Sequence, residues 1–272
     1  MIDRRNRSTT VVLAAVLVVL VLMSGTAMAR EHERLAILVY HRFHPAIAGP
    51  TTVTDGVFEA QLAWLAAYHI RVAPLHSAVD SLRGDTPMAE PPCVAITVDD
   101  GHRSVYTDMF PLIQRYRIPV TLFVYPSAIS NAPYALTWEQ LEEMAKSGLV
   151  EVQSHTFWHP DFWQEKAKRT AADYRAFVVM QLAQSKERIE ARLGGRVDLL
   201  AWPFGIHDAE LEEEAARAGY RAAFALGRRP ALPGGNMFAL PRYAVSEADR
   251  GARFAAVIEA ACPEKPELEK PE

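Results

Sequence analysis

The chain of 272 residues predicts an α/β fold in which a parallel sheet is closed, or nearly closed, into a barrel within a single domain. Two observations lead to this prediction. Short apolar segments alternate with longer amphipathic ones for about eight rounds along most of the chain. Some apolar segments, such as "VTLFVY" at 120–125, are continuous runs of β-branched and aromatic residues, which are typical of strands covered on both faces.

Eight segments are predicted to be strands because they are short, apolar and bounded by turn residues. They span residues 35–41, 70–75, 94–98, 120–125, 150–155, 198–204, 221–226 and 239–245. The longer segments between them are predicted to be helices. In the first of these, 57–68, the apolar residues Phe58, Leu62 and Leu65 recur at helical spacing.

The later helices are predicted from their end signals. Thr137 and Gln140 form a capping box, and Gly148 marks the end of the helix that follows. A long amphipathic helix is predicted from about residue 170 to the Gly-Gly pair at 194–195. The last predicted helix begins after Asp208 and ends at Gly219.

The first 29 residues are predicted to be a secretory signal peptide. Three arginines precede the apolar run "VVLAAVLVVLVLM", and Ala27 and Ala29 provide an A-x-A cleavage site. The sequence therefore predicts an exported protein, periplasmic or extracellular, whose mature domain spans 30–262. An uncleaved membrane anchor is the alternative, although the run is short for a span. The proline- and charge-rich segment 263–272 is predicted to be a disordered tail.

The composition excludes some classes of function. The chain is 50% hydrophobic and has a formal net charge of −4, so it can form a large core and has no basic surface that would favour nucleic acid. Its two cysteines are Cys93 and Cys262. Export permits a disulfide between them, but their spacing does not require one. Both are expected to be structural.

Unusual polar residues follow four of the predicted strands. His41 ends the first strand, Asp99 and Asp100 follow "VAITV", His155 ends "VEVQSH", and "PFG" at 203–205 follows "LLAW". In β/α barrels the chemistry gathers at the carboxyl ends of the strands. These four positions therefore predict one common site.

The stretch "SHTFWHP" predicts a metal centre. His155 and His159 are four residues apart, so in a helical turn both imidazoles would point toward one ion. With Asp100 they make a three-ligand set that leaves a coordination position open, as in catalytic zinc sites. Taken alone, the histidine pair is more often a surface pair and "DDG" a polar turn. His102 is expected to be a loop residue and not a ligand.

A dication would also explain why two aspartates stand side by side. It stabilises the ionised form of both carboxylates and offsets their mutual repulsion. Asp100 would bind the ion, and Asp99 would remain free to accept a proton from water activated by the metal.

With these residues in place, the chain resembles the polysaccharide deacetylases of the NodB-homology type, which have a distorted (β/α) barrel. "TVDDG" (97–101) matches the family's T-F-D-D-G motif, with Val98 in place of the usual aromatic residue. "HTFWHP" (155–160) matches H-[ST]-x-x-H-P, and "AWPFG" (201–205) resembles R-x-P-[YF]. The resemblance spans roughly residues 35–245, nearly all of the mature chain.

The resemblance implies an enzyme that hydrolyses acetyl groups, mostly N-acetyl, on a polysaccharide substrate. Asp99 would be the general base, and Asp100, His155 and His159 would bind a divalent metal, zinc, cobalt or nickel. The backbone N–H of Phe204 would help to hold the oxyanion. The groove under the sugar would be shaped by three residues: Trp202, Pro203 and Phe204. For Trp202 an ordinary place in the core is an equal alternative.

The chain departs from the family pattern in two places. No histidine follows residue 207, where many members carry the catalytic acid in a late motif. "LVYH" at the start resembles the circularly permuted branch of exported poly-N-acetylglucosamine deacetylases, which implies His41 as the general acid. Ala201 stands where many relatives have a base-orienting arginine, and Arg242 is predicted to replace it, with Arg103 as a weaker candidate.

Phe162 and Trp163, just past the second histidine, are predicted to be exposed and to stack on sugar rings; the alternative is a loop anchored in a side pocket. Two other functions stay open. One is the same site acting on O-acetyl groups or short oligosaccharides. The other is a glycan-binding protein with a degenerate site, which the full set of Asp99, Asp100 and both histidines disfavours.

Overall fold

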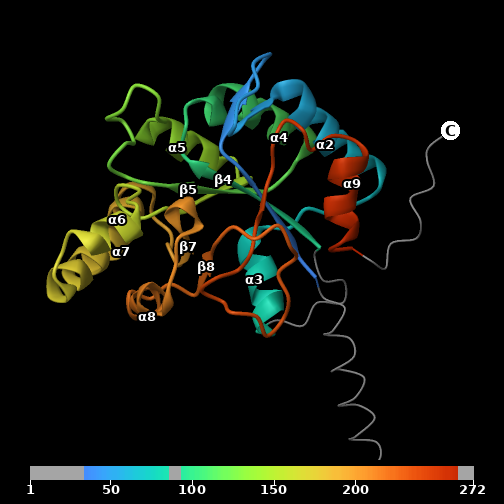
Figure 1. Cartoon of the computed structure of the whole chain (residues 1–272). Coiled ribbons are helices and arrows are strands. Elements are labelled where there is room, and N and C mark those ends of the chain that lie inside the picture. Colours follow the sequence, from blue (N-terminus) through green and yellow to red (C-terminus); the bar gives the residue numbers. More distant parts are fainter. Residues whose placement is uncertain (1–33, 86–92, 263–272) are drawn as a thin grey trace, which may run out of the picture. The chain divides into compact units, whose positions relative to one another are not determined.

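Seven parallel strands form the central sheet of the computed structural model, which describes residues 34–85 and 93–262 (Figure 1). They are β1 (Ala36–Tyr40), β4 (Val94–Asp100), β5 (Val120–Val124), β6 (Val150–Ser154), β7 (Leu199–Ala201), β8 (Ala222–Phe224) and β9 (Tyr243–Ala244). Their order in the sheet is β8-β7-β6-β5-β4-β1-β9. Two short strands, β2 (Arg42–His44) and β3 (Thr52–Thr54), pair separately. The predicted signal peptide (1–29) and tail (263–272) lie outside the described residues.

The last strand segment joins the two edges of the sheet. Leu240 pairs with Phe224 of β8. Further along the same segment, after Arg242, Ala244 pairs with Val39 of β1. Val245 continues this contact by donating its N–H to the carbonyl of Val39 at 3.0 Å. The sheet is therefore curled and bridged by one segment, which confirms the predicted barrel-like α/β class.

Helices surround the sheet, and the four with predicted bounds begin within two residues of the predicted positions. They are α2 (Asp55–Ala67), α3 (Leu75–Arg83), α4 (Phe110–Tyr116), α5 (Trp138–Lys146), α6 (Phe162–Ala167), α7 (Ala171–Leu193), α8 (Ala209–Arg217) and α9 (Ala252–Glu259). The capping box of Thr137 and Gln140 is present at α5, and Asp208 caps α8. Within the described residues, no helix is both long and apolar enough to cross a membrane.

The predicted strand at 70–75 is wrong. Only Val72 forms a bridge, to Val94 at the start of β4, and α3 begins at Leu75. Pro74 lies between them and has no N–H to donate to a strand ladder, so pairing stops there and the helix starts. The segment is as apolar as predicted because Ile70, Val72 and Ala73 are buried, but they form irregular chain before α3.

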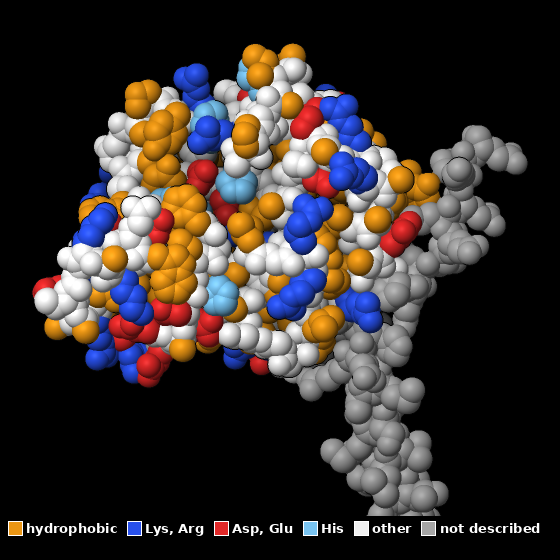
Figure 2. Space-filling model, viewed as in Figure 1, with side chains coloured by type: hydrophobic (Ala, Val, Ile, Leu, Met, Phe, Trp, Pro, Cys, Tyr) orange, Lys and Arg blue, Asp and Glu red, His pale blue; other side chains and the backbone are white. Residues whose placement is uncertain are grey.

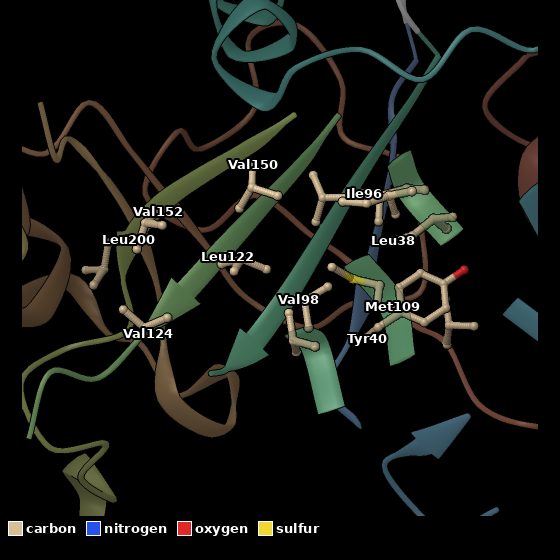
Figure 3. Close-up of a cluster of buried hydrophobic side chains, with 14 of the residues drawn as sticks. Leu38, Tyr40, Ile96, Val98, Met109, Leu122, Val124, Val150, Val152 and Leu200 are labelled. Atoms are coloured by element: carbon tan, nitrogen blue, oxygen red, sulfur yellow. The ribbon is translucent and has the colours of Figure 1, made fainter. Parts of the chain in front are cut away.

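Alternation along the strands decides which side chains face the interior of the curled sheet. On β4, Ile96 and Val98 belong to the large cluster between sheet and helices (Figure 3). Ala95 belongs instead to an inner cluster, together with Phe123 of β5 and Leu75 of α3. Because side chains alternate along a strand, residue 99 shares the inner face with Ala95.

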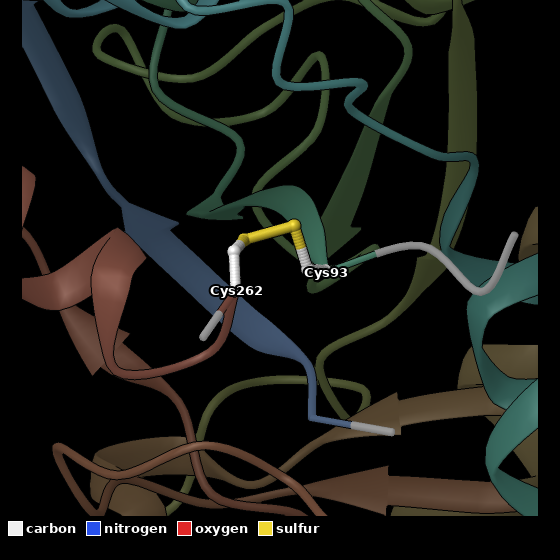
Figure 4. Close-up of a disulfide and its surroundings, with 2 residues drawn as sticks. All are labelled: Cys93 and Cys262. Atoms are coloured by element: carbon white, nitrogen blue, oxygen red, sulfur yellow. A yellow bond between two sulfur atoms is a disulfide. The ribbon is translucent and has the colours of Figure 1, made fainter. Parts of the chain in front are cut away.

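Cys93 and Cys262 form a disulfide that ties the residue before β4 to the end of α9 (Figure 4). The two cysteines are 169 residues apart in sequence, so the bond closes a loop that includes most of the sheet. Cys262→Ser is therefore expected to lower the free energy of unfolding by about 2–4 kcal/mol, because the unfolded chain regains the freedom that the cross-link removed. Urea unfolding under oxidising conditions measures this loss.

Cys93→Ser provides the control for this prediction. Either single variant breaks the same bond, so both should lose the same stability and the double variant should lose no more. Reductant should destabilise the unmodified protein to the same extent and leave the variants unaffected. Equal unfolding midpoints for the unmodified protein and Cys262→Ser would contradict the prediction.

A charged cluster lies near the amino ends of the strands. His76 of α3 contacts two carboxylates at once, with Nδ1 2.5 Å from Glu151 and Nε2 2.5 Å from Asp198. Arg196 adds a second ion pair to Asp198 at 2.9 Å. Burial alone would lower the pKa of His76, but the hydrogen bonds to Asp198 and Glu151 raise it to about 9. The ring is therefore a cation at neutral pH that joins α3 to β6 and β7.

This cluster predicts a pH-dependent contribution to stability. The pKa of His76 is higher in the folded chain than the ordinary value of about 6.5, so its contribution is complete below pH 6.5 and is lost as pH rises through about 9. His76→Gln should be less stable than the unmodified protein by on the order of 2 kcal/mol at pH 6, and this gap should close by pH 10. Urea unfolding at pH 6, 8 and 10 tests this, and a constant gap would contradict it.

Candidate metal centre and active site

The acidic pair at the end of β4 is held by an unusual backbone turn. Asp99 is buried, whereas Asp100, the last residue of β4, has a φ of 73° and turns the chain away. Gly101 follows with a φ of 74°, and a Cβ on it would lie 3.1 Å from side-chain atoms of Val124 and Ile129. The glycine of "DDG" is therefore required twice, by its conformation and by close packing. This turn allows the two adjacent carboxylates to face different partners.

Arg242 is the partner of Asp99. Its Nη1 and Nη2 donate to the two carboxylate oxygens of Asp99 at 2.8 and 2.7 Å, and both side chains are buried. Nη1 also donates to the hydroxyl of Thr97 at 3.2 Å. Burial by itself raises the pKa of Asp99, but the charges of Arg242 and His155 oppose this and hold that pKa at about 2. Asp99 is therefore ionised and fixed in one rotamer.

The structure thus brings Arg242 to Asp99, where the sequence predicts it. The arginine comes from the segment that joins the sheet edges, and it lies in the interior beside the ring of Phe123. Ala201 on β7 has a methyl side chain, which carries no charge. The side chain of Arg103, the weaker candidate, is exposed and forms no ion pair with Asp99.

The three predicted metal ligands lie together. One nitrogen from each of His155 and His159 and one oxygen of Asp100 are within 4.8 Å of one another. The Nε2 atoms of the two histidines are 3.7 and 3.6 Å from Oδ1 of Asp100. Nδ1 of His155 donates to the carbonyl of Ala201 at 2.8 Å, which leaves Nε2 free to bind. Two imidazoles and a carboxylate are a donor set that suits a divalent transition metal.

The predicted helical turn at "HTFWH" is wrong. Thr156 and His159 both have a φ of 64°, which no α-helix accommodates, and the segment is a bent loop. In this bent loop the two rings meet edge to face, and their centroids are 4.7 Å apart. Burial and the neighbouring His155 lower the pKa of His159 to about 4, so its ring is neutral, the form that binds metals.

His41 and Phe204 border this centre. His41 follows β1 and is close enough to Asp99 and Asp100 for their charges to raise its pKa, although burial has the larger effect and lowers it. Phe204 is 60% exposed, and its ring centroid is 4.6 Å from that of His159. Phe204 also has a φ of 57°, so the "PFG" turn is strained at the residue predicted to hold the oxyanion.

For two aromatic residues the structure selects the buried one of the two places that the sequence left open. Trp202 is 0% exposed and its Nε1 donates to the carbonyl of Phe238 at 2.9 Å, so it lies in the core and does not line a groove. Phe162 is also buried, with its ring 6.0 Å from that of Trp202. Phe162 is the first residue of α6, and its ring packs against those of Trp202 and Phe177. Pro203 is buried as well, and only Phe204 of the "WPF" motif reaches the surface.

Backbone strain concentrates at this site. Asp100, Thr156, His159 and Phe204 are four of the eight non-glycine residues with positive φ in the described part of the chain. Each such residue costs on the order of 1 kcal/mol, and such outliers cluster at functional sites. The backbone strain is therefore independent support for a functional site at the position where the metal-ligand side chains lie.

Sequence reasoning missed Tyr125. This residue follows β5, its ring centroid lies 5.4 Å from that of His159, and its hydroxyl is 3.0 Å from that of Tyr134. Tyr125 ends the predicted strand 120–125, so the rule that selected His41 and His155 from strand ends would also have selected it. A tyrosine at the end of an apolar strand carries no charge and was read as part of the strand.

The comparisons with known proteins agree on one family. Residues 87–223 match the polysaccharide deacetylase family. YxkH of Bacillus subtilis (strain 168), a protein named for that family, is 27% identical over 236 residues, 87% of this chain and 80% of that protein. The poly-β-1,6-N-acetyl-D-glucosamine N-deacetylase of Escherichia coli (strain K12) is 25% identical over 209 residues, 64% of this chain but 31% of that protein.

Solved structures share the fold. IcaB from Ammonifex degensii superposes with a TM-score of 0.72 at 26% identity and covers 84% of this chain and 98% of that one. The Streptococcus pyogenes deacetylase PplD gives a TM-score of 0.74 at 20% identity, with coverages of 83% and 98%. The matched sequence, the curled parallel sheet and the convergent acidic and histidine residues have one consistent explanation: the chain belongs to the polysaccharide deacetylase family.

Proposed function

We propose that this chain is a metal-dependent hydrolase that removes N-acetyl groups from an exported or cell-wall polysaccharide of the N-acetylglucosamine type. The observation that carries the proposal is the meeting, at one end of the sheet, of an ionised Asp99 held by Arg242 with the ligand set of Asp100, His155 and His159. A binding protein would need neither the buried ion pair nor an open metal position. The relatives named for poly-β-1,6-N-acetyl-D-glucosamine support the choice of glycan.

Each residue then has a defined task in hydrolysis. A bound divalent ion, zinc in our proposal with cobalt or nickel as substitutes, supplies Lewis acidity toward the acetyl carbonyl and lowers the pKa of water. Asp99 accepts the proton of the water that attacks the carbonyl carbon. The N–H of Phe204 donates to the developing oxyanion. His41 donates a proton to the leaving nitrogen as the C–N bond breaks, which yields acetate and a free amine.

Exposed aromatic side chains support a glycan as the substrate. Phe204 touches His159, and Trp158 in the loop between the two histidines is 47% exposed. Trp163, which is 49% exposed, follows His159 by four residues, in α6. Figure 2 shows hydrophobic side chains beside histidine and carboxylate side chains on one face. Aromatic faces of this kind can stack on the apolar faces of sugar rings. Phe162, predicted to share this role, is buried and takes no part.

Export is also a proposal. The sequence predicts a signal peptide, and the disulfide of Cys93 with Cys262 is of a kind that persists in oxidising compartments. The substrate would then be met outside the cytoplasm, where polymeric N-acetylated glycans lie.

Acetate release from defined glycans tests the function. The protein loaded with Zn²⁺, Co²⁺ or Ni²⁺ should release acetate from β-1,6-linked N-acetylglucosamine oligomers, faster from longer ones, and chelator should abolish this release. O-acetylated xylan serves as the comparison substrate. Release from the O-acetylated glycan alone would overturn the assignment to N-acetyl groups, and no release from any glycan would overturn the proposed activity.

His41→Ala tests the general acid. It should lower kcat by roughly 10²-fold or more, because the amine must then leave without a positioned proton donor. Metal content, measured by atomic emission on the dialysed protein, should stay unchanged. His207→Ala is the matched control, because His207 pairs with Glu212 and has no place in the proposed mechanism. Loss of metal from His41→Ala would instead identify His41 as a ligand.

A further inference from the structure

The loop that joins the two metal-binding histidines has an unusual need for hydrogen-bond acceptors. It is bent and not helical, so its N–H groups have no helical carbonyls to bond to, and its first two residues, His155 and Thr156, are buried. The N–H of His155 is satisfied by the carbonyl of Val124 at 2.9 Å. Those of Thr156 and His159 donate to the hydroxyls of Ser154 and Thr156, both at 3.2 Å.

The two remaining N–H groups share one acceptor. Phe157 and Trp158 both donate to Oε1 of Gln181, each at 3.1 Å. Of the two polar atoms of the side-chain amide, only the oxygen can accept hydrogen bonds. This contact therefore also fixes the orientation of the amide. Gln181 thus takes the place of the carbonyl that a helix would have supplied.

Gln181 lies on the buried face of α7, which is otherwise apolar apart from Tyr174 and Ser185. It is 0% exposed and is flanked by the buried residues Val178 and Leu182. One turn on, the hydroxyl of Ser185 lies 2.7 Å from that of Ser154, the residue before His155. A buried polar side chain is costly unless it is bonded, and both of these bond to the segment that carries the histidines.

We propose that Gln181 is a positioning residue of the metal centre: by accepting both N–H groups between the ligands, it sets the distance between His155 and His159. This inference rests on the proposed function in that it takes these histidines as ligands. The bond to Gln181 holds the loop between two left-handed residues, Thr156 and His159. Without it, the loop relaxes and the second imidazole moves away from Asp100.

Gln181→Met tests the inference, because methionine has a similar length but no strong acceptor. The dissociation constant for Co²⁺, titrated into the metal-free protein and followed by its visible absorption, should rise by roughly 10- to 100-fold, as for other residues that orient metal ligands. The spectrum of the saturated site should also change, since the second histidine is displaced. Gln184→Met, the same substitution on the exposed side of α7, should match the unmodified protein.

Two further variants keep the test decisive. In Gln181→Glu the side chain has the same length and still ends in an acceptor oxygen, so this variant should keep most of the Co²⁺ affinity of the unmodified protein. Gln181→Asn withdraws the oxygen by one methylene and should weaken Co²⁺ binding as well, so it replaces Gln181→Met if that variant does not fold. A purely structural role would lower the melting temperature of the metal-free protein but leave the affinity of the folded fraction unchanged.

The outcomes separate the inference from the proposed function. If the unmodified protein itself fails to bind Co²⁺, the metal centre and the proposed function are both wrong. If the unmodified protein binds Co²⁺ and folded Gln181→Met or Gln181→Asn binds it as tightly, only the role of Gln181 is overturned.

Discussion

Asp99→Asn is expected to lower kcat for acetate release by roughly 10²- to 10⁴-fold, the range over which a positioned general base contributes. Asparagine has the same shape and keeps one acceptor oxygen, but it cannot take a proton from water. The metal affinity should stay within a few fold, because Asp99 is not one of the three ligand residues. Steady-state assays on longer oligomers, with metal content measured in parallel, provide both quantities.

Asp100→Asn is the matched comparison for this prediction. It changes the adjacent carboxylate in the same way, but that carboxylate faces both imidazoles. The expected defect is therefore loss of metal, partly rescued at high metal concentration. Rescue of Asp99→Asn by added metal, or near-normal turnover by that variant, would show that the two aspartates have been assigned the wrong way round.

The class of fold and the place of the site could be predicted because both depend on local sequence patterns. Strand and helix periodicity predicts a parallel sheet, and residues at the carboxyl ends of its strands must meet. Asp99, Asp100 and His155 follow directly from this rule, and the structure places them together. Arg242 does not follow from this rule, because it lies just before β9 and not at its carboxyl end; its long side chain reaches Asp99 from there.

Other features depend on tertiary packing that no local pattern reveals. The spacing of His155 and His159 is equally compatible with a helix and with a bent loop, and the loop depends on an acceptor from α7 that lies far away in sequence. Likewise, nothing in "DFW" tells which of the two aromatic residues faces outward. Phe162 and Trp163 are the first two residues of α6, and adjacent residues of a helix point in different directions, so Phe162 is buried and Trp163 is exposed.

Arg242→Met is expected to have the largest effect on stability. It leaves the buried carboxylate of Asp99 without a counter-charge, which should lower the free energy of unfolding by about 3–5 kcal/mol at pH 7. Burial then raises the pKa of Asp99, because the guanidinium no longer opposes it. In the unmodified protein that pKa is about 2, below the ordinary value, so the stabilisation is present above about pH 4 and is lost as pH falls through 2.

The deficit of Arg242→Met should therefore shrink as pH is lowered from 7 toward 3, where the variant can protonate Asp99. Urea unfolding at several pH values measures this directly. The double variant Asp99→Asn/Arg242→Met removes both charges, so it should be more stable than Arg242→Met alone. Such non-additivity requires that the two charges interact in the folded protein. If the two single losses simply added, Arg242 would stabilise the barrel independently of Asp99, and its bidentate contact would not be what keeps the base ionised.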